Sequence, residues 1–290
     1  MPSVLITGAA RGIGRSIAIH LAANGWEVFA GVRTDDDAAA IAMNHPITPV
    51  ILDITDADHL AALDSSLPES LDAVVNNAGV LVYGPLEALS LAELRRQFEV
   101  NVFGQIAVTQ AVLPRLRRAQ GRIVLVSSLT GKVALPLIGA YCASKFALEA
   151  AGDVLRMELK RWNIAVALIE AGATDTDMCR NGHDMLDDAA ARLSAEHREL
   201  YEGHFTGLNN SLMSQMTAAP VPPEKVAAVV VKALTARRPR DRYFIAAGDK
   251  LQQALMTQLP ATARDWVLRR VTNQPGSSQP SRRLLRLAGM

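Results

Sequence analysis

The sequence predicts an α/β fold in which helices cover both faces of a parallel sheet of about seven strands. Short apolar runs alternate along the chain with longer segments of helical spacing. The runs are continuously apolar, which is typical of strands buried on both faces. Of the 290 residues, 49% are hydrophobic, enough for a large core. We therefore expect a single Rossmann-type domain with a doubly wound sheet and right-handed crossovers.

The order of these elements can be followed from the start of the chain. The first strand is predicted at Val4-Leu5-Ile6, and the next helix carries Ile13, Ile17 and Leu21 on one stripe. Asn24-Gly25 ends this helix, because glycine readily adopts the left-handed conformation at a helix C-terminus. Further strands are predicted at 27–32, 50–52, 73–75, 123–126 and 165–169, with helices at 60–67, 91–118 and 141–162.

Two regions depart from this rhythm. Residues 175–222 have no strand signal and are expected to form a lid over the domain of residues 1–250. Residues 251–290 are predicted to be a helical extension and tail, in which 272–281 have the composition of a flexible tether. The basic tail at 282–287 could lie on a membrane surface, dock on a neighbouring subunit or be disordered.

Composition narrows the class of protein. A net charge of +1, from 30 basic and 29 acidic residues, argues against a nucleic-acid partner. Two cysteines make no disulfide framework, and no apolar run is long enough to span a membrane, so a cytoplasmic protein is expected. The spacing of His183, His197 and His204 does not suit metal binding, and no metal is predicted.

A glycine-rich turn lies between the first strand and the first helix. It reads Thr7-Gly8-Ala9-Ala10-Arg11-Gly12-Ile13-Gly14. Glycines allow a tight turn and let a pyrophosphate approach the backbone at a helix N-terminus. Three glycines alone would fit a surface turn equally well. Their place in a strand–turn–helix–strand unit predicts dinucleotide binding.

Two arginines favour NADP(H) over NAD(H). NAD sites usually place an acid at the end of the second strand, where this chain has Val32 followed by Arg33. Arg11 is a second cation, and a guanidinium pairs well with the 2′-phosphate of NADP. Solvated arginines are the simpler alternative. Asp35, Asp36 and Asp37 leave NAD(H) possible, although they are expected to cap a helix at 38–43.

A tyrosine and a lysine share one face of a predicted helix. Tyr141 and Lys145 are four residues apart, so their side chains are neighbours. A phenol has a pKa of about 10, and a nearby ammonium, helped by the positive nicotinamide ring, would lower this pKa. Ser128, at the end of a predicted strand, could bind a substrate oxygen. The three side chains could together form a proton-transfer site, although Tyr-x-x-x-Lys alone occurs by chance in many helices.

With these motifs in order, the chain resembles the short-chain dehydrogenase/reductase family over about residues 3–250. The spacing of thirteen residues from Ser128 to Tyr141 is also that of the family. The Ala30-Gly31-Val32-Arg33 segment and the long C-terminal extension are similar to the steroid and retinoid dehydrogenase branch. The matching residues are the glycine-rich turn, Asp53, Asn76-Asn77-Ala78-Gly79, Asn101, Ser128 and Tyr141-Cys142-Ala143-Ser144-Lys145.

The resemblance implies a role for each residue. Tyr141 would be the general acid/base, Lys145 would lower its pKa and hold the nicotinamide ribose, and Ser128 would orient the carbonyl. Asn101 would support a water-linked proton path to Lys145. Asn77 could instead be a turn residue that only ties strands together. The residues expected to contact the cofactor are Gly8, Arg11, Gly12, Ile13, Gly14, Arg33, Asp53, Asn77, Ala78, Gly79, Tyr141, Lys145 and Thr176.

One segment departs from the family pattern. The family commonly has Pro-Gly after the sixth strand, whereas this chain reads Glu170-Ala171-Gly172. Loss of proline frees the backbone angle and restores an N–H at Ala171. The following loop, with Thr176 as the expected contact of the nicotinamide carboxamide, is therefore expected to be less rigid.

The expected reaction is hydride transfer between NADP(H) and a carbonyl or secondary alcohol. The Met, Leu and Phe content of 175–222 indicates a lipophilic substrate or, alternatively, side chains that only pack the lid. A 3-oxoacyl-thioester reductase would use Arg180 and Arg192 for its carrier, and a non-catalytic NADP(H)-binding regulator is a further alternative. The family implies a homodimer or homotetramer through helices 91–118 and 141–162.

Overall fold

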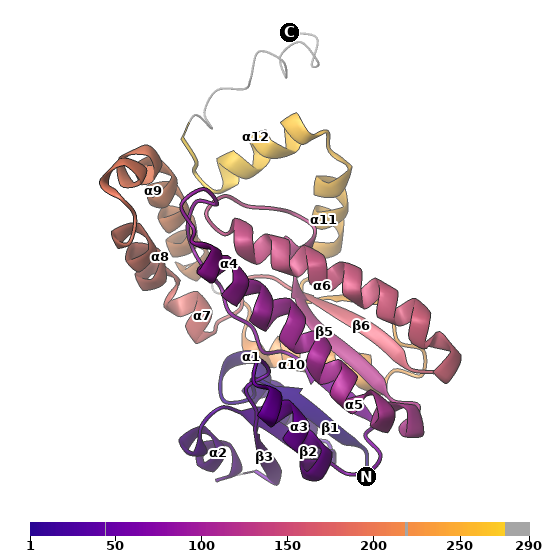
Figure 1. The fold of residues 1–290 in the computed structure, drawn as a ribbon. Coiled ribbons are helices and arrows are strands. Elements are labelled where there is room, and N and C mark those ends of the chain that lie inside the picture. Colours follow the sequence, from indigo (N-terminus) through magenta and orange to yellow (C-terminus); the bar gives the residue numbers. More distant parts are fainter. Residues whose placement is uncertain (44, 218–219, 276–290) are drawn as a thin grey trace.

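The sheet of the computed structural model, which describes residues 1–43, 45–217 and 220–275, has seven parallel strands (Figure 1). They are β1 (Ser3–Thr7), β2 (Glu27–Val32), β3 (Ile47–Ile51), β4 (Ala73–Asn76), β5 (Arg122–Ser128), β6 (Ala165–Ala171) and β7 (Arg242–Phe244). Their order in the sheet is β3-β2-β1-β4-β5-β6-β7. The winding therefore reverses between β1 and β4, which confirms the predicted doubly wound fold. In such folds ligands bind at the carboxyl ends of the strands beside this reversal.

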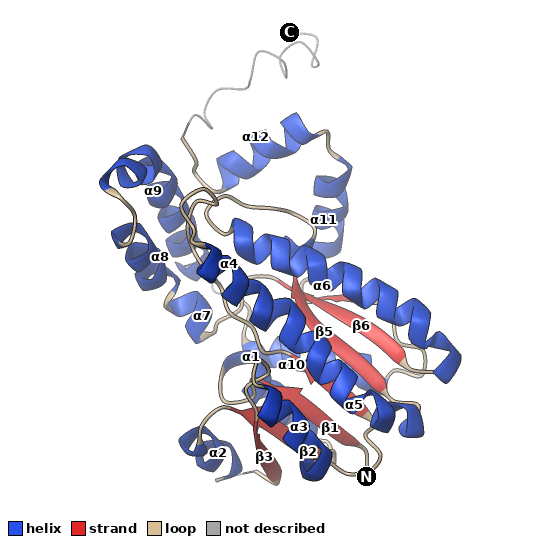
Figure 2. Cartoon of the chain, in the orientation of Figure 1, coloured by secondary structure: helices blue, strands red, loops and turns tan. Residues whose placement is uncertain are grey.

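Helices cover both faces of the sheet because successive strand residues point in opposite directions. Val4 and Ile6 pack with Ile17 and Val230 on one face, whereas Leu5 on the other face belongs to a separate buried cluster. Figure 2 shows the helices of the second face lying across the strands. The first face is covered by α1 (Gly12–Ala23), α2 (Asp35–Ala42) and α10 (Pro223–Thr235), and the second by α3 (Ala57–Ser66), α5 (Gln105–Ala119) and α6 (Gly139–Glu158).

The predicted long helix at 91–118 is interrupted by a π-helical turn. It consists of α4 (Leu91–Phe98), the π-helix η1 (Glu99–Gly104) and α5. A capping box of Ser90 and Glu93 begins α4. Two 3₁₀ turns, η2 (Leu129–Gly131) and η3 (Leu159–Trp162), follow β5 and α6.

A second group of helices gathers beyond the carboxyl ends of β6 and β7 (Figure 1). We call it the cap, and it includes residues 272–275. Its buried side chains form a third apolar cluster, which contains Leu186, Phe205 and Leu208. The cap helices are α7 (Asp177–Arg180), α8 (Gly182–Ala191), α9 (Ala195–Thr217), α11 (Asp249–Gln258) and α12 (Ala261–Val271).

Three local predictions differ from the structure. The N-cap of α2 is Thr34, which accepts a hydrogen bond from the Asp37 amide, so the three aspartates occupy the first turn instead of capping it. β7 contains charged and aromatic residues rather than an apolar run, and the sequence pattern did not locate it. Residues 272–275 are not a loose tether, because Thr272 and Gln274 are buried. The basic tail lies outside the described residues.

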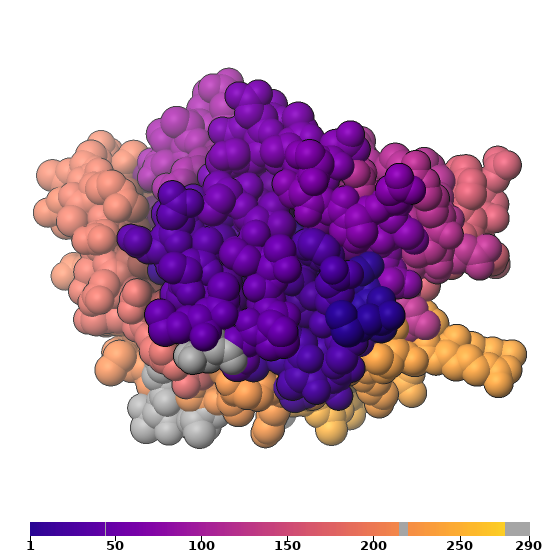
Figure 3. All heavy atoms as spheres, turned by 90° about the horizontal axis from the view of Figure 1, so that it is seen from below, coloured from indigo at the N-terminus to yellow at the C-terminus, as the bar shows by residue number. Residues whose placement is uncertain are grey.

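The chain begins in the middle of the sheet and builds outwards. β1 has two strands on one side and four on the other. Figure 3, viewed from below, accordingly shows the first third of the chain at the centre with later segments around it. The β1–α1 turn therefore lies beside the switch in winding direction.

Candidate active site

The glycine-rich turn after β1 has a backbone that other residues would strain. Gly8 and Gly12 have φ angles of +65° and +53°, in the left-handed region. A β-carbon at Gly14 would lie 2.2 Å from the Gly8 carbonyl oxygen and 2.5 Å from Asn77 Nδ2. The turn is therefore packed directly against its neighbours, and all three glycines are required by its geometry.

The first turn of α1 offers free backbone N–H groups at this place. Within the described chain, the N-cap residue Arg11 makes no side-chain cap hydrogen bond, and no acid lies in the first turn. By contrast, Asp56 caps α3 through two backbone amides. Partial positive charge at an uncapped N-terminus suits an anionic ligand such as a pyrophosphate.

Asn77 ties the end of β4 to the glycine turn. Its Nδ2 donates to the carbonyl oxygens of Thr7 and Gly8 at 3.0 and 3.1 Å. The buried Thr7 hydroxyl accepts hydrogen bonds from the amides of Asn77 and Ala78, both at 3.0 Å. Thus the structural role considered for Asn77 is present, and it places Ala78 and Gly79 beside the turn.

Arg11, Arg33 and Asp53 lie in the segments that follow β1, β2 and β3. Arg11 and Arg33 are exposed, and neither forms a salt bridge within the described residues. Burial raises the pKa of Asp53, but hydrogen bonds from Thr55 and the charge of Arg33 leave it below its usual value. The Asp53 carboxylate accepts from the Thr55 amide and hydroxyl at 2.9 and 2.7 Å. Both cations therefore remain available for an anionic ligand.

Tyr141 and Lys145 project from the first turns of α6 towards the end of β5. The Lys145 ammonium lies 5.7 Å from the centre of the Tyr141 ring and donates to the Val126 carbonyl oxygen at 2.8 Å. Ser128, the last residue of β5, accepts from the Thr130 amide and hydroxyl at 3.2 and 2.9 Å. The structure thus brings all three side chains to the carboxyl edge of the sheet.

The groups of the protein itself raise the pKa of Tyr141. Burial raises it to about 12, while a hydrogen bond with Ser128 acts in the opposite direction. Burial also lowers the pKa of Lys145 to about 8, against the negative charge of Glu149. Desolvation raises the pKa of Tyr141 more than the charge of Lys145 lowers it, because the ammonium is directed to the Val126 carbonyl oxygen. The protein alone therefore favours a neutral phenol at pH 7.

Asn101 lies in the π-helical turn η1 and joins two parts of the site. Its Oδ1 accepts from the Val80 amide at 2.8 Å, and its Nδ2 donates to the Val80 carbonyl oxygen at 3.0 Å and the Ser144 hydroxyl at 3.1 Å. Ser144 directly precedes Lys145 in α6. The strand–helix spacing gave no sign of the π-turn, a feature frequent at functional sites.

The loop after β6 meets the glycine turn through Thr176. A β-carbon at Gly12 would lie 3.1 Å from Thr176 Cγ2, so the two segments are in contact distance. Ala171, where the family pattern has proline, is the last residue of β6 and pairs with Ser128. The strand therefore continues through this position, and the loop begins after it.

A buried charged cluster behind Lys145 was not anticipated from the sequence. Arg242 of β7 forms ion pairs with Glu149, Asp153 and Glu170 at 3.0, 2.8 and 3.4 Å. One sign of this cluster was present in the sequence, because Glu149 follows Lys145 by four residues on α6 and so shares its face. Gln253 of α11 donates to Glu170, so the cluster links the sheet to the cap.

The described residues contain no group of three His, Cys, Asp or Glu side chains arranged to hold a metal ion. Within the same residues, no helix combines the length and apolar character needed to cross a bilayer.

Comparison with known proteins gives consistent matches. A family profile described as "short chain dehydrogenase" matches residues 2–187. The NADPH-dependent 3-dehydrocapnine reductase of Ornithobacterium rhinotracheale is 31% identical over 90% of this chain and 93% of its own. Retinol dehydrogenase 5 of Mus musculus is 32% identical, covering 95% of this chain and 90% of its own. A solved short chain dehydrogenase from Burkholderia cenocepacia in complex with NADP is 25% identical, with a TM-score of 0.68, over 89% of this chain and 98% of its own.

Proposed function

Because the chain belongs to the short-chain dehydrogenase/reductase family, whose members act on alcohol and carbonyl groups, we propose that it transfers a hydride between NADP(H) and a lipophilic ketone, aldehyde or secondary alcohol. The carrying observation is the convergence of Tyr141, Ser128 and Lys145 beside the glycine turn at one sheet edge. Curated relatives in the retinoid branch agree with the predicted resemblance.

The residues present fit a dinucleotide. The uncapped N-terminus of α1 and the space kept by Gly14 suit a pyrophosphate. Arg11 and Arg33, exposed and without salt bridges within the described chain, suit the 2′-phosphate of NADP(H), and named relatives include an NADPH-dependent enzyme. When bound, the cofactor supplies the hydride and a nicotinamide ring that is positively charged when oxidised.

The side chains of this protein would place the substrate and move the proton. Tyr141 donates its phenolic proton to the carbonyl oxygen during reduction, and Ser128 orients that oxygen by a hydrogen bond. The Lys145 ammonium, together with the positive ring, favours the phenolate that burial disfavours. Asn101 holds Ser144 and so positions the turn of α6 that carries Lys145. A proton transfer of this kind contributes about 10² to 10⁴ in rate.

The cap supports a lipophilic substrate. Tyr141 packs at the edge of an apolar cluster that contains Tyr83, Leu137, Leu186 and Leu208. A carbonyl compound beside Tyr141 would therefore extend into an apolar surrounding. Packing of the cap, the alternative role considered for the apolar residues of 175–222, involves the same side chains.

A 3-oxoacyl-thioester reductase is less well supported. Such an enzyme needs cations for its carrier, and the candidates were Arg180 and Arg192. Arg180 is paired with Asp175 and Asp177 at 2.7 and 3.6 Å, and Arg192 lies 3.9 Å from Glu93. Both are therefore already engaged within the chain. A purely regulatory role is disfavoured because both Tyr141 and Lys145 are retained.

An oligomer through α4, α5 and α6 is part of the proposal. Exposed apolar side chains that a partner would cover lie on α4, η1 and α6, among them Leu91, Phe103, Phe146 and Met157. A second copy of the chain is the expected partner, as a homodimer or homotetramer.

Reduction of a panel of carbonyl compounds tests the proposed function. Purified protein is mixed with NADPH or NADH and with lipophilic ketones, aldehydes and acetoacetyl thioesters, and loss of the reduced nicotinamide absorbance is followed. We expect turnover of lipophilic carbonyls with preference for NADPH. Preference for acetoacetyl thioesters would identify a 3-oxoacyl thioester as the substrate instead of a lipophilic carbonyl compound. No turnover of any carbonyl together with tight NADPH binding would favour the regulatory role.

A further inference from the structure

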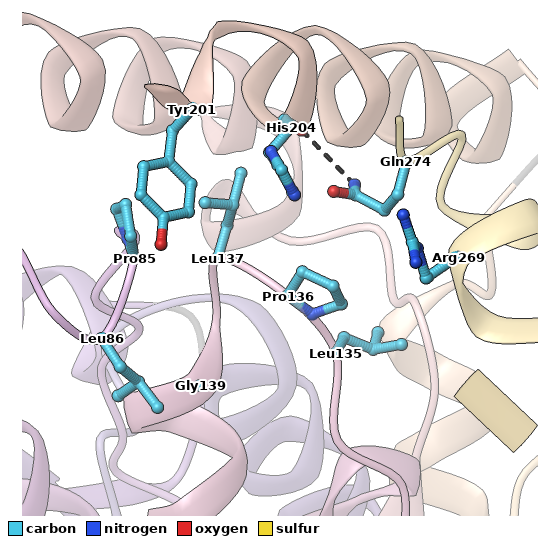
Figure 4. Close-up of a pocket in the computed structure, with 10 residues that line it drawn as sticks. All are labelled: Pro85, Leu86, Leu135, Pro136, Leu137, Gly139, Tyr201, His204, Arg269 and Gln274. Carbon is cyan, nitrogen blue, oxygen red and sulfur yellow. Dashed lines mark hydrogen bonds between the residues drawn. The ribbon is translucent and has the colours of Figure 1, made fainter. Parts of the chain in front are cut away.

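A cavity of about 280 Å³ lies between the sheet domain and the cap, outside the catalytic residues (Figure 4). One wall is the loop before α6, with Leu135 and Leu137, and the opposite wall is α9 with His204. Arg269 of α12 and Gln274 complete it, so the C-terminal extension contributes directly to the cavity. Its volume is slightly below the usual range for small-molecule pockets, which suits part of a ligand.

This cavity adjoins the reacting end through a shared wall. Leu135 and Leu137 belong to the same apolar cluster as Tyr141. The Leu135 amide donates to the sulfur of Cys142 at 3.4 Å, next to Tyr141 in α6. The cavity and Tyr141 therefore border the same apolar cluster.

The far wall is built by close packing. A β-carbon at Gly207 would lie 2.2 Å from the Asn273 carbonyl oxygen, and one at Gly203 would lie 2.8 Å from Pro275 Cγ. These two glycines, one turn apart on α9, admit residues 272–275 against the helix. Gln274 is buried as a result, and its amide nitrogen donates to the Thr272 carbonyl oxygen at 3.0 Å.

Polar groups collect at one end of the cavity, as Figure 4 shows for His204, Gln274 and Arg269. Within the described structure, His204 Nδ1 and Gln274 Oε1 are buried atoms without hydrogen-bond partners. Buried polar atoms are normally paired, and His204 Nδ1 can donate to a ligand in the tautomer that carries its proton there, whereas Gln274 Oε1 can only accept. Burial and the charge of Arg269 lower the pKa of His204, which leaves Arg269 as the cation there.

At the opposite rim the Tyr201 hydroxyl donates to Glu87 at 2.6 Å. The lining also includes the apolar side chains of Leu86, Leu135 and Leu137. Arg269 forms no salt bridge among the described residues, and its guanidinium donates to the Pro275 carbonyl oxygen. The cavity is thus apolar along its length and cationic at one end.

We propose that this cavity holds the distal end of the substrate and that this end carries a carboxylate, which Arg269 recognises. The protein then acts on a lipophilic carbonyl compound with an acidic terminus. The reduction of such a compound rests on the proposed function. The binding of an acid-terminated chain in the cavity does not.

Binding of an unreactive probe tests the cavity without turnover. Dodecanoate and dodecanol are titrated by calorimetry into the wild-type protein, Arg269→Gln and the control Arg270→Gln. Arg270 is exposed on the same helix and lies over the Trp266 ring. We expect Arg269→Gln to weaken dodecanoate binding about tenfold or more and to leave dodecanol unchanged. Equal effects on both probes, an equal loss in Arg270→Gln, or no binding of dodecanoate would overturn the inference.

Turnover then separates this inference from the proposed function. The reduction of an oxo fatty acid is compared with that of its methyl ester in the same three proteins. Loss of kcat/KM for the acid alone in Arg269→Gln supports the carboxylate site. Reduction of both compounds without dependence on Arg269 contradicts the site but leaves the reductase intact. Arg269-dependent binding of dodecanoate with no reduction of any carbonyl contradicts the reductase instead.

Discussion

Gly14 in the cofactor turn and Gly207 in the cap meet the same steric demand. At either position a β-carbon would lie 2.2 Å from a backbone carbonyl oxygen, of Gly8 in the first case and Asn273 in the second. Gly14 belongs to a recognisable motif because its partner is six residues away. Gly207 meets a partner 66 residues further along the chain, and no short pattern marks it. Local constraints leave a signature in sequence, whereas long-range packing does not.

Gly14→Ala should have the larger effect of the two glycine substitutions. The new methyl group must displace backbone at Gly8 and the amide of Asn77, which together hold the turn beside the proposed pyrophosphate site. A displacement of this size costs about 100-fold in a positioned interaction. NADPH affinity, measured by fluorescence titration, should fall accordingly. Unchanged NADPH affinity in a folded Gly14→Ala protein would place the cofactor elsewhere.

Gly207→Ala should loosen the cap while sparing the cofactor end. Alanine favours a helix by up to about 1 kcal/mol, but a clash with a rigid backbone costs about 1–3 kcal/mol, so the net change should be destabilising or small. Amide exchange at 272–274 should accelerate, with NADPH affinity unchanged. Gly248→Ala, where nothing lies within 4 Å of the added carbon, is the control. Unaltered exchange at 272–274 would show that this packing does not hold the segment.

Glu170 of β6 is hydrogen-bonded to Gln253 of the cap, and it should make the stability of the protein depend on pH. Burial raises its pKa to about 7, from 4.5. A pKa raised by folding means that the stability contribution is complete below about pH 4.5 and is lost as pH rises through about 7. The expected loss is about 1–3 kcal/mol, since one unit corresponds to about 1.4 kcal/mol.

Urea unfolding between pH 4.5 and 8 measures this contribution. Glu170→Gln should remove that part of the pH dependence, whereas Glu158→Gln, an exposed change on α6, should retain it. An identical pH profile for Glu170→Gln and the wild type would show that the buried cluster does not titrate in this range.

Much of the sheet domain could be predicted from local pattern. The apolar runs located six of the strands, and the four-residue spacing of Tyr141 and Lys145 placed both side chains on one face of a helix. Spacing in the sequence could not show how far a side chain is removed from water, however. The expected fall in the Tyr141 pKa counted the charges of Lys145 and of the nicotinamide ring, and it left out burial, which raises this pKa to about 12.

The features that were missed depend on contacts between distant segments. β7 is three residues long, and its half-buried Arg242 forms ion pairs with the buried Glu149 and Glu170. Arg269 and Gln274 reach the cavity because α9 accepts the C-terminal segment, and residues 272–275 had been assigned to a tether on composition alone. Composition indicates how flexible a segment is in isolation, and here packing against α9 holds the segment in place.

The central claim is that Tyr141, in the sheet domain, donates the proton to the substrate oxygen. Its most direct test is rapid mixing of Tyr141→Phe with NADPH and a ketone that the wild type reduces. We expect the rate of hydride transfer to fall by about 10² to 10⁴ while the NADPH dissociation constant stays the same. Hydride transfer at the wild-type rate in Tyr141→Phe would contradict the account.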